Sequence, residues 1–550
     1  MVPLTRRLSS SVALFALSSL GLARQGLPPL PPVPQNPPTV EKALLGEALF
    51  WEEQLSSTRS VACGTCHIPS AGGSDPRSGG AASLHPGPDG IAGTADDVVG
   101  SPGVVRNQAN GAYRPHDSFG LGLQVTGRKS PSMINAAYAR ELFWDGRASG
   151  AFVDPITGVL AIPRGGALES QAAGPLVSDV EMAHEGRDWT EVLDRLDRIE
   201  PLALADRLPA DLEAWIAGRS YPELFLEVFG SSDPTATEAL FAIATYERTL
   251  LSDQTPFDAF NAGDPTALTP QELRGRNLFN GPANCTRCHG GPLLTDDRFH
   301  NIGVRPAAED RGRAAVTGAP QDEGAFKTPG LRNVALRAPY FHNGRFDTLA
   351  DVVAFYDRGG DFDDNLSPLI EPLGLTPQQQ ADLVAFLDRA LTDPRVLAET
   401  GPFERPRLAS ETNRAPVRFG RPTRGSGGFV PEMVVHEPGL LGNPNLTVGI
   451  EDALGGAEAL LVIDTVRRPK GRLVGGARAY PAFSAAQIVR GFEPLHGVGE
   501  GAGAGWNSVS IAVPDDPALL GVQLTMQWAV FDPGSAGGLA ATRAASIPLF

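Results

Sequence analysis

Two copies of a five-residue motif use every cysteine of the chain. The motif is Cys-x-x-Cys-His, and it occurs as Cys63-Gly64-Thr65-Cys66-His67 and as Cys285-Thr286-Arg287-Cys288-His289. Residues three apart share one face of a helical turn, so both thiols of one copy can form thioethers with the two vinyl groups of one porphyrin. The His that follows can then ligate the iron from one side. The sequence therefore predicts two haem c groups, with His67 and His289 as iron ligands.

Paired cysteines have three other interpretations, namely a thioredoxin-like redox pair, a zinc site and structural disulfides. A thioredoxin-like pair requires neither a second copy nor the trailing His. A zinc site of four Cys is compatible with the spacing, but it leaves His67 and His289 without a role. The haem interpretation accounts for all six residues.

Composition restricts the partners of the chain. It has 550 residues, enough for two to four domains, and its 42% hydrophobic and 20% charged residues are ordinary for a globular protein. The formal net charge of −17 argues against nucleic acid and anionic membranes as partners. The same charge would suit a basic electron-donor protein, and it is equally explained by a need for solubility.

Residues 1–23 read as a secretory signal peptide. Arg6 and Arg7 give a positive start, residues 12–22 an apolar core, and residues 21–23 a small-x-small cleavage site. This apolar run is too short to span a bilayer, and no later stretch is long enough, so the chain is not expected to be membrane-spanning. A periplasmic or secreted location suits c-type haem, which is attached outside the cytoplasm. Residues 24–40 are expected to be an extended Pro-rich tether.

The pattern of apolar residues changes from helical to alternating along the chain. Apolar periodicity predicts helices from residue 40 to the first motif, over 188–250, over 348–356 and over 378–390. Residues 399–430 are rich in Pro, Gly and Arg and predict a linker. Residues 431–550 contain alternating or apolar runs between turns, which predict an all-β, sandwich-like domain without cofactor ligands of its own.

Several motifs beyond the cysteines carry a family resemblance. They are the block Phe143-Trp144-Asp145-Gly146-Arg147, the set Gln171, Pro175 and Glu181-Met182, and Leu331-Arg332-Asn333 followed by Pro339-Tyr340-Phe341-His342. Together with both haem motifs they resemble the bacterial di-haem cytochrome c peroxidases and their MauG-like branch, over about 41–395. The resemblance implies a mainly α chain with two cytochrome c-like haem domains, over 41–265 (peroxidatic) and 266–398 (electron transfer), ahead of the β domain.

The resemblance also implies roles for individual residues. Gln171, Pro175 and Glu181 would line the pocket of the first haem, and Trp144 would lie between the two haems on the electron path. The chemistry of peroxide cleavage independently favours a pocket carboxyl that moves a proton between the two oxygens, provided that burial raises its pKa. For an arbitrary Glu a surface position would be the simpler expectation, and Trp144 could serve in core packing as well.

Axial ligands distinguish the branches of the family. The residue aligned with the loop His that caps the first iron of the peroxidases is Leu121, which cannot ligate, whereas His85 and His116 in the same loop could substitute. We therefore expect an open, five-coordinate first haem. At the second iron the peroxidases use a Met, and the aligned residue is Tyr356, as in the MauG-like branch. The weaker competitors for this position are His300 and His342.

Calcium is left as an open alternative. The family commonly binds calcium between the haems, partly through an Asn whose position is held by Lys129. A Lys ammonium has no acceptor atom, and its charge could replace that of the metal. Residues 89–97 have the oxygen-rich composition of a calcium loop, but they lack the EF-hand spacing and are better explained as a solvated turn.

The sequence thus predicts a di-haem peroxidase that reduces hydrogen peroxide at the first haem with electrons from the second. The electron donor would be a small cytochrome or copper protein, or an oxidised protein or small substrate. The alternative is a non-catalytic di-haem electron carrier, in which both irons would be six-coordinate.

Overall fold

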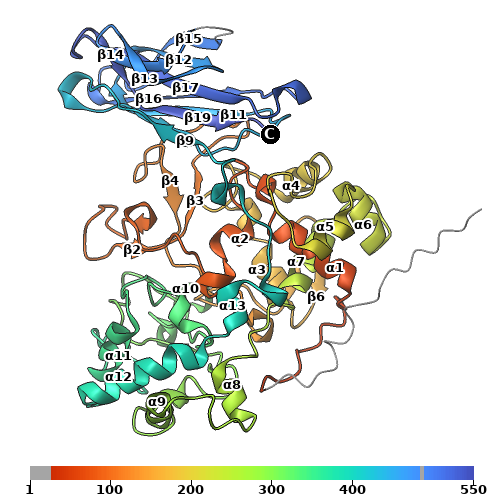
Figure 1. Ribbon diagram of the computed structural model, residues 1–550. Coiled ribbons are helices and arrows are strands. Elements are labelled where there is room, and N and C mark those ends of the chain that lie inside the picture. Colours follow the sequence, from red (N-terminus) through yellow and green to blue (C-terminus); the bar gives the residue numbers. More distant parts are fainter. Residues whose placement is uncertain (1–25, 484–487) are drawn as a thin grey trace, which may run out of the picture.

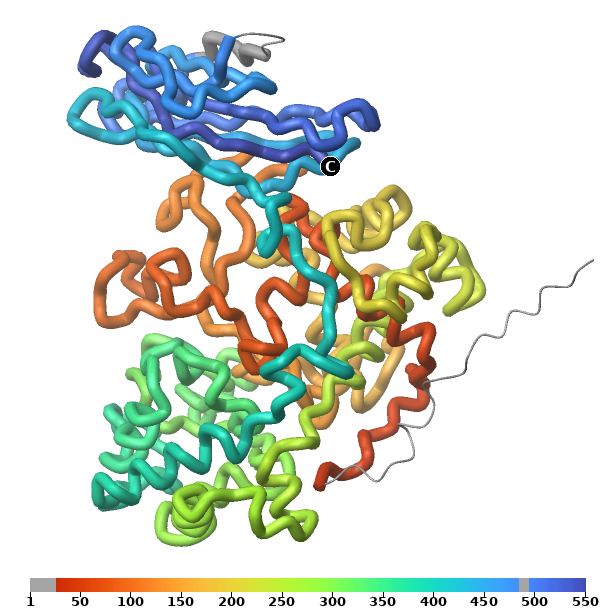
Figure 2. The backbone as a smooth tube through the Cα atoms, viewed as in Figure 1, coloured from red at the N-terminus to blue at the C-terminus, as the bar shows by residue number. Residues whose placement is uncertain are grey.

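The computed structural model describes residues 26–483 and 488–550, so the predicted signal peptide over 1–23 lies outside the described residues. Two helical regions and one strand-rich region follow each other along the chain, and they stack with the strand-rich region at one end (Figure 1). Figure 2 shows the backbone passing from the first helical region to the second and then returning along the first to reach the strands. No helix among the described residues is long and apolar enough to cross a membrane.

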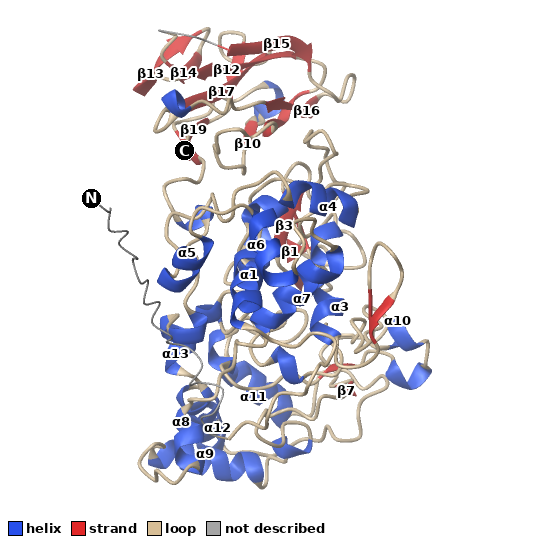
Figure 3. Cartoon of the chain, turned by 90° about the vertical axis from the view of Figure 1, so that its right-hand side faces the viewer, coloured by secondary structure: helices blue, strands red, loops and turns tan. Residues whose placement is uncertain are grey.

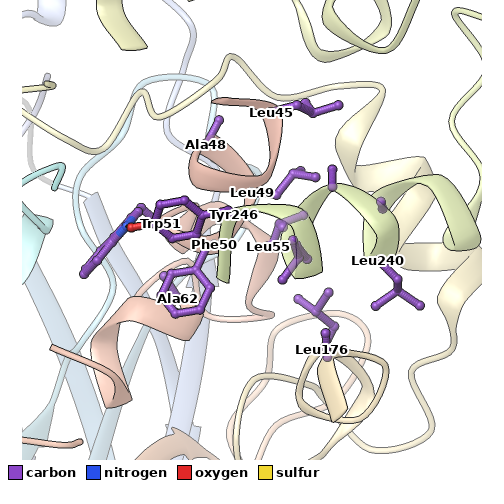
Figure 4. Packing of buried hydrophobic residues seen from close by; sticks show 14 of the residues in the cluster. Leu45, Ala48, Leu49, Phe50, Trp51, Leu55, Ala62, Leu176, Leu240 and Tyr246 are labelled. Atoms are coloured by element: carbon purple, nitrogen blue, oxygen red, sulfur yellow. The ribbon is translucent and has the colours of Figure 1, made fainter. Parts of the chain in front are cut away.

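The first helical region surrounds the largest hydrophobic cluster. Its helices are α1 (Val40–Phe50), α2 (Cys63–Cys66), α3 (Ala167–Ala172), α4 (Trp189–Leu196), α5 (Ala210–Ile216), α6 (Tyr221–Phe229) and α7 (Ala236–Glu247). Helices α1 and α7 pack closely because Gly46 lies directly against the carbonyl of Ala242, where a Cβ would collide. Their large side chains fill the centre of the cluster (Figure 4). The helices predicted from residue 40 and over 188–250 are confirmed.

The Pro-rich segment ahead of α1 has no helix or strand, and it lies against the first helical region. Leu27, Val33 and Asn36 are buried. The side-chain amide of Asn36 donates hydrogen bonds to Glu169 Oε1, at 2.9 Å, and to the Phe241 carbonyl. This part of the expected tether is therefore fixed to the folded chain.

The second helical region has its own cluster. Its helices are α8 (Pro256–Asn261), α9 (Pro270–Asn280), α10 (Ala314–Thr317), α11 (Leu349–Asp357), α12 (Pro377–Leu387) and α13 (Pro394–Ala398). Helices α8, α9 and α12 each begin with a Thr cap followed by Pro, a strong start signal. Thr348 caps α11 as predicted, accepting from Asp351 N–H. Figure 3 shows α8, α9 and α12 at the end opposite the strands.

The two helical regions contain a short structural repeat. Phe143-Trp144-Asp145-Gly146-Arg147 and Phe341-His342-Asn343-Gly344-Arg345 each form a turn closed by an antiparallel bridge. Phe143 and Phe341 share a positive φ, as do Asn135 and Asn333 in the short helical turns that precede them. Trp144 and His342 therefore hold equivalent positions in the two copies.

Short strands lie within the loops of the two helical regions. They are β1 (Leu84–His85), β2 (Val98–Val99), β3 (Pro102–Val105), β4 (Leu123–Val125), β5 (Phe152–Val153), β6 (Leu160–Ile162), β7 (Phe299–His300) and β8 (Phe326–Lys327). Strands β3 and β4 pair to form a hairpin that runs from the first helical region toward the strand-rich region (Figure 1).

The C-terminal region is rich in strands, as predicted. A three-stranded antiparallel sheet has the order β10 (Glu432–Val434), β11 (Leu446–Leu454), β16 (Ala502–Ile511). A larger sheet has the order β15 (Ile488–Pro494), β12 (Glu458–Asp464), β17 (Gln523–Phe531), β19 (Ala544–Pro548), β9 (Val417–Phe419), with β18 (Leu539–Ala541) beside β17. Strands β13 (Arg467–Val474) and β14 (Ala477–Pro481) form a hairpin. Both sheets contribute to one core, and β9 comes from the segment expected to be linker.

Candidate active site

One cavity of about 460 Å³ lies beside the first Cys-x-x-Cys-His motif, within the usual size range of cofactor pockets. Every residue predicted for the first site lines this cavity: Cys63, Cys66, His67, Trp144, Gln171, Pro175 and Glu181. These residues come from α2, the turn after Phe143, α3 and the segment that follows it. The fold thus brings together residues up to 118 positions apart in sequence.

The histidine of the motif is prepared to bind a metal. His67 Nδ1 lies 3.0 Å from the Gly73 carbonyl oxygen, so Nδ1 carries the proton and the lone pair is on Nε2. Burial lowers the pKa of His67, which keeps the ring neutral. Burial also raises the pKa of the Cys63 thiol to about 12. Two adjacent thiols and a neutral imidazole on one cavity wall fit a haem c.

The backbone of α2 is held by close packing. Gly64 lies against the indole of Trp51, where a Cβ would collide. The indole N–H of Trp51 donates to the Tyr246 hydroxyl at 2.9 Å. Any larger residue at position 64 would have to displace the motif or the Trp51 indole.

Glu181 presents a carboxyl to the cavity. Burial raises its pKa, and the nearby Arg147 acts in the opposite direction. None of the described residues donates a hydrogen bond to the carboxylate, which leaves both oxygens available. Gln171 lies in the last turn of α3, and Pro175 begins the short turn Pro175–Val177.

The charged residues Arg147 and Glu247 also line the cavity and were not singled out from the sequence. Arg147 stacks on Phe143, with its guanidinium carbon 3.5 Å from the ring centroid. Glu247 is 4% exposed, has one carboxylate oxygen without a partner, and has its pKa raised to about 8 by burial. Arg147 belongs to a motif that was recognised, whereas Glu247 ends the largely buried helix α7 and carries no such signal.

The histidines expected to compete for the first iron lie outside the cavity lining. His116 Nδ1 accepts a hydrogen bond from Ser118 N–H, and its ring packs on Phe119, as does the ring of His85. Leu121 is fully buried in a separate apolar cluster with Tyr113.

Lys129 also reaches this cavity and is buried. Its ammonium donates to Ser74 Oγ at 2.6 Å, and its backbone N–H donates to the His342 carbonyl at 2.8 Å. Burial, together with the positive charge of Arg337, lowers the pKa of Lys129 to about 7. Two basic side chains therefore meet at the position where the resemblance implied a calcium ligand.

The second motif repeats the geometry of the first. His289 Nδ1 lies 3.0 Å from the Leu294 carbonyl oxygen, and burial lowers the pKa of His289 to about 4. Burial raises the pKa of Cys285 to about 12. Tyr356 on α11 is near both thiols of this motif, and burial with these thiols raises its pKa. A neutral imidazole, two thiols and a phenol therefore gather at a second site that fits a haem c.

His300 and His342, the alternatives to Tyr356 as a ligand of the second iron, differ in their contacts. His300 Nε2 lies 2.8 Å from Asp296 Oδ2, and these two residues with Cys288 have ligand atoms within 4.8 Å of one another. His342 stacks on Phe326 at a centroid distance of 3.6 Å, and its Nε2 has no partner among the described residues.

Aromatic rings connect the two sites. The Trp144 ring lies 6.3 Å from that of His342, and the indole N–H donates to the Lys129 carbonyl at 2.7 Å. Phe341, the neighbour of His342, lies 6.2 Å from Tyr356. The structural repeat thus places one aromatic residue from each copy at the junction between the sites.

The sequence of the chain is similar to those of known proteins. The family model described as di-haem cytochrome c peroxidase matches residues 40–266. The chain is 32% identical over 415 residues to cytochrome-c peroxidase IdrP1 of Pseudomonas sp. (strain SCT), covering 69% of this chain and 89% of the relative. The chain belongs to the di-haem cytochrome c peroxidase family. Its two Cys-x-x-Cys pairs are consistent with two haem c groups, and it is an oxidoreductase of this family.

Another relative is similar as well. Methylamine utilization protein MauG of Methylorubrum extorquens is 31% identical over 364 residues, covering 66% of this chain and 81% of that protein. Among solved structures, a MauG-like protein associated with microbial copper homeostasis has 27% identity and a TM-score of 0.48, covering 69% of this chain and 97% of that chain.

Proposed function

We propose that the chain reduces hydrogen peroxide at the haem held by Cys63, Cys66 and His67, with electrons relayed from the haem held by Cys285, Cys288 and His289. The observation that carries this proposal is the cavity shared by the first motif and Glu181. The two helical regions and the strand-rich region would then correspond to a peroxidatic haem domain, an electron-transfer haem domain and a sandwich-like accessory domain.

Glu181 is proposed to move the proton. When bound, haem c supplies the redox chemistry of peroxide reduction, and two electrons and two protons convert hydrogen peroxide into two water molecules. Glu181 takes the proton from one peroxide oxygen and delivers it to the other, which leaves as water. Its raised pKa suits this role because a carboxyl that titrates nearer to neutrality both accepts and returns a proton. Gln171 and Pro175 shape the cavity around the same position.

Trp144 is proposed to carry electrons between the haems. The rings of Trp144 and His342 are in edge contact, and Phe341 continues toward Tyr356. Tyr356, with His289, would be a ligand of the second iron. The ultimate donor would be a small cytochrome or copper protein, or a protein or small substrate that is itself oxidised, in the periplasm or outside the cell.

The rival proposal is a di-haem electron carrier, and the ferric spectrum separates the two. We expect absorption and electron spin resonance spectra of the ferric protein to show one high-spin haem, because neither His85 nor His116 lines the first cavity. One equivalent of peroxide should change the signal of that haem. Two low-spin haems that are unchanged by peroxide would support the carrier instead.

Calcium is not part of the proposal at the position of Lys129. A divalent cation placed beside the buried Lys129 and Arg337 would meet repulsion from their positive charges. We therefore expect dialysis against a calcium chelator to leave the haem spectra and the rate of peroxide reduction unchanged. A loss of activity that added calcium restores would contradict this expectation.

A further inference from the structure

The hairpin of β3 and β4 joins the cavity to the C-terminal strands. At its base, Ser101, Gly103, Thr126 and Gly127 line the cavity. Its tip, residues 106–122, reaches the three-stranded sheet of β10, β11 and β16 (Figure 1). One continuous element therefore touches both the cavity and a region more than 300 residues later in the chain.

Apolar packing holds the tip of the hairpin. Val105, Tyr113 and Leu121 from the hairpin form one buried cluster with Val434 of β10, and Trp506 of β16 packs against it. Tyr113 and Leu121 are both fully buried. Packing of this kind fixes a loop that would otherwise be free at its tip.

Hydrogen bonds hold the same tip. The Leu121 N–H donates to Glu451 Oε2 at 2.8 Å, and the Tyr113 hydroxyl donates to Glu437 Oε1 at 3.1 Å. The Tyr113 N–H donates to Ser508 Oγ at 3.0 Å, and that hydroxyl donates back to the Tyr113 carbonyl. Glu437 is 1% exposed, so its bond to Tyr113 lies in a protected environment.

The other end of the hairpin holds the segment of Glu181. Val104 N–H donates to the Val180 carbonyl at 3.1 Å, and the Gln124 side chain donates to the Asp179 carbonyl at 2.7 Å. Gly103 lies against this backbone so closely that a Cβ would collide with the Val180 carbonyl. Glu185 N–H also donates to the Asn107 carbonyl. The backbone is therefore held by hydrogen bonds on both sides of Glu181.

We propose that residues 431–550 position Glu181, acting through the hairpin of β3 and β4. This inference rests on the proposed function of Glu181, and it gives the accessory region a role in the peroxide reaction without direct contact to the cavity. Tyr113, Glu437 and Glu451 are then positioning residues. A shift of about 1 Å in a proton-transferring group can cost roughly 100-fold in rate, so a partial loosening of the tip should be measurable.

The test weakens the contacts of the hairpin tip by changing only residues of the three-stranded C-terminal sheet. The double variant Val434→Ala/Glu451→Ala removes apolar contact and the acceptor of Leu121 N–H. We expect both haems to be bound as in the wild type and the second-order rate constant with peroxide to fall about tenfold. The matched control is Leu473→Ala/Glu458→Ala, which makes the same kinds of change at exposed residues of β13 and β12 and should react like the wild type.

A double-mutant cycle shows whether the effect passes through Glu181. In the Glu181→Gln background the same Val434→Ala/Glu451→Ala change should slow the reaction no further, because the group that the hairpin positions is gone. Equal slowing in both backgrounds would overturn the inference, as would an unchanged rate of the double variant in the wild-type background.

If the double variant fails to fold, Tyr113→Phe is the deciding variant, with an expected decrease in rate of about fivefold from one lost hydrogen bond. If Glu181→Gln alone leaves the rate unchanged, the proposed role of Glu181 fails, and the inference fails with it.

Discussion

Replacing Glu181 by Gln should slow the reaction of the ferric protein with hydrogen peroxide by about 10²- to 10⁴-fold, the usual contribution of a general acid–base group. The amide keeps the shape of the side chain but cannot accept a proton and return it. Haem content should be unchanged, because Glu181 touches neither motif through a hydrogen bond. Stopped-flow absorption after mixing with peroxide measures the rate.

The pH dependence gives the same prediction a second readout. Burial raises the pKa of Glu181, so the wild type should lose its reaction rate as the pH falls through that raised value and the carboxylate takes up a proton. Glu181→Gln should lack this acidic limb. The matched control is Glu213→Gln, an exposed carboxyl on α5 that lies in neither the cavity nor the hairpin. If both variants react at the wild-type rate, Glu181 has no part in proton transfer.

Much of the first site could be predicted because its residues lie in short, recognisable motifs. Cys63, Cys66 and His67 are adjacent, and Trp144 belongs to a five-residue block. Helix α11 could be placed from the cap at Thr348 and the apolar residues after it. These motifs can be recognised in the sequence because the residues that interact in them are only a few positions apart.

Contacts between distant residues were not predictable in the same way. Leu121 was noted only because it cannot ligate iron, whereas its side chain packs into a cluster with Val434, and its N–H donates to Glu451. Strand β9 lies in a segment with the composition of a linker, and it becomes a strand because β19 offers an open edge. Glu247 has no motif around it, and only the fold brings it to the cavity.

The two sites differ in the further iron ligand that their residues could offer besides the histidine. Gln171, Pro175 and Glu181 in the first cavity offer no strong iron ligand, whereas a phenol lies near the cysteines of the second. Since both histidines have the same hydrogen bond from Nδ1 to a backbone carbonyl, we expect the difference between the two haems to arise mainly from these other residues.

Replacing Tyr356 by Met should raise the reduction potential of the second haem by on the order of 0.1 V, within the roughly 0.8 V range that axial ligands span. A phenolate is anionic and stabilises ferric iron, whereas a neutral thioether favours the ferrous state. The potential of the first haem should stay close to its wild-type value, because Tyr356 is not among the residues that line its cavity. A spectroelectrochemical titration that resolves both haems measures the two potentials.

Tyr340→Phe is the matched control for this substitution. Tyr340 is a buried tyrosine in the hydrophobic cluster of the second helical region, and its hydroxyl lies 3.5 Å from the Ala335 carbonyl. Loss of that hydroxyl should leave both potentials nearly unchanged. If Tyr356→Met behaves like the control, Tyr356 is not an iron ligand, and His300 or His342 becomes the next candidate. His342 would then be tested first, because its Nε2 lacks a partner among the described residues, whereas His300 is already paired with Asp296.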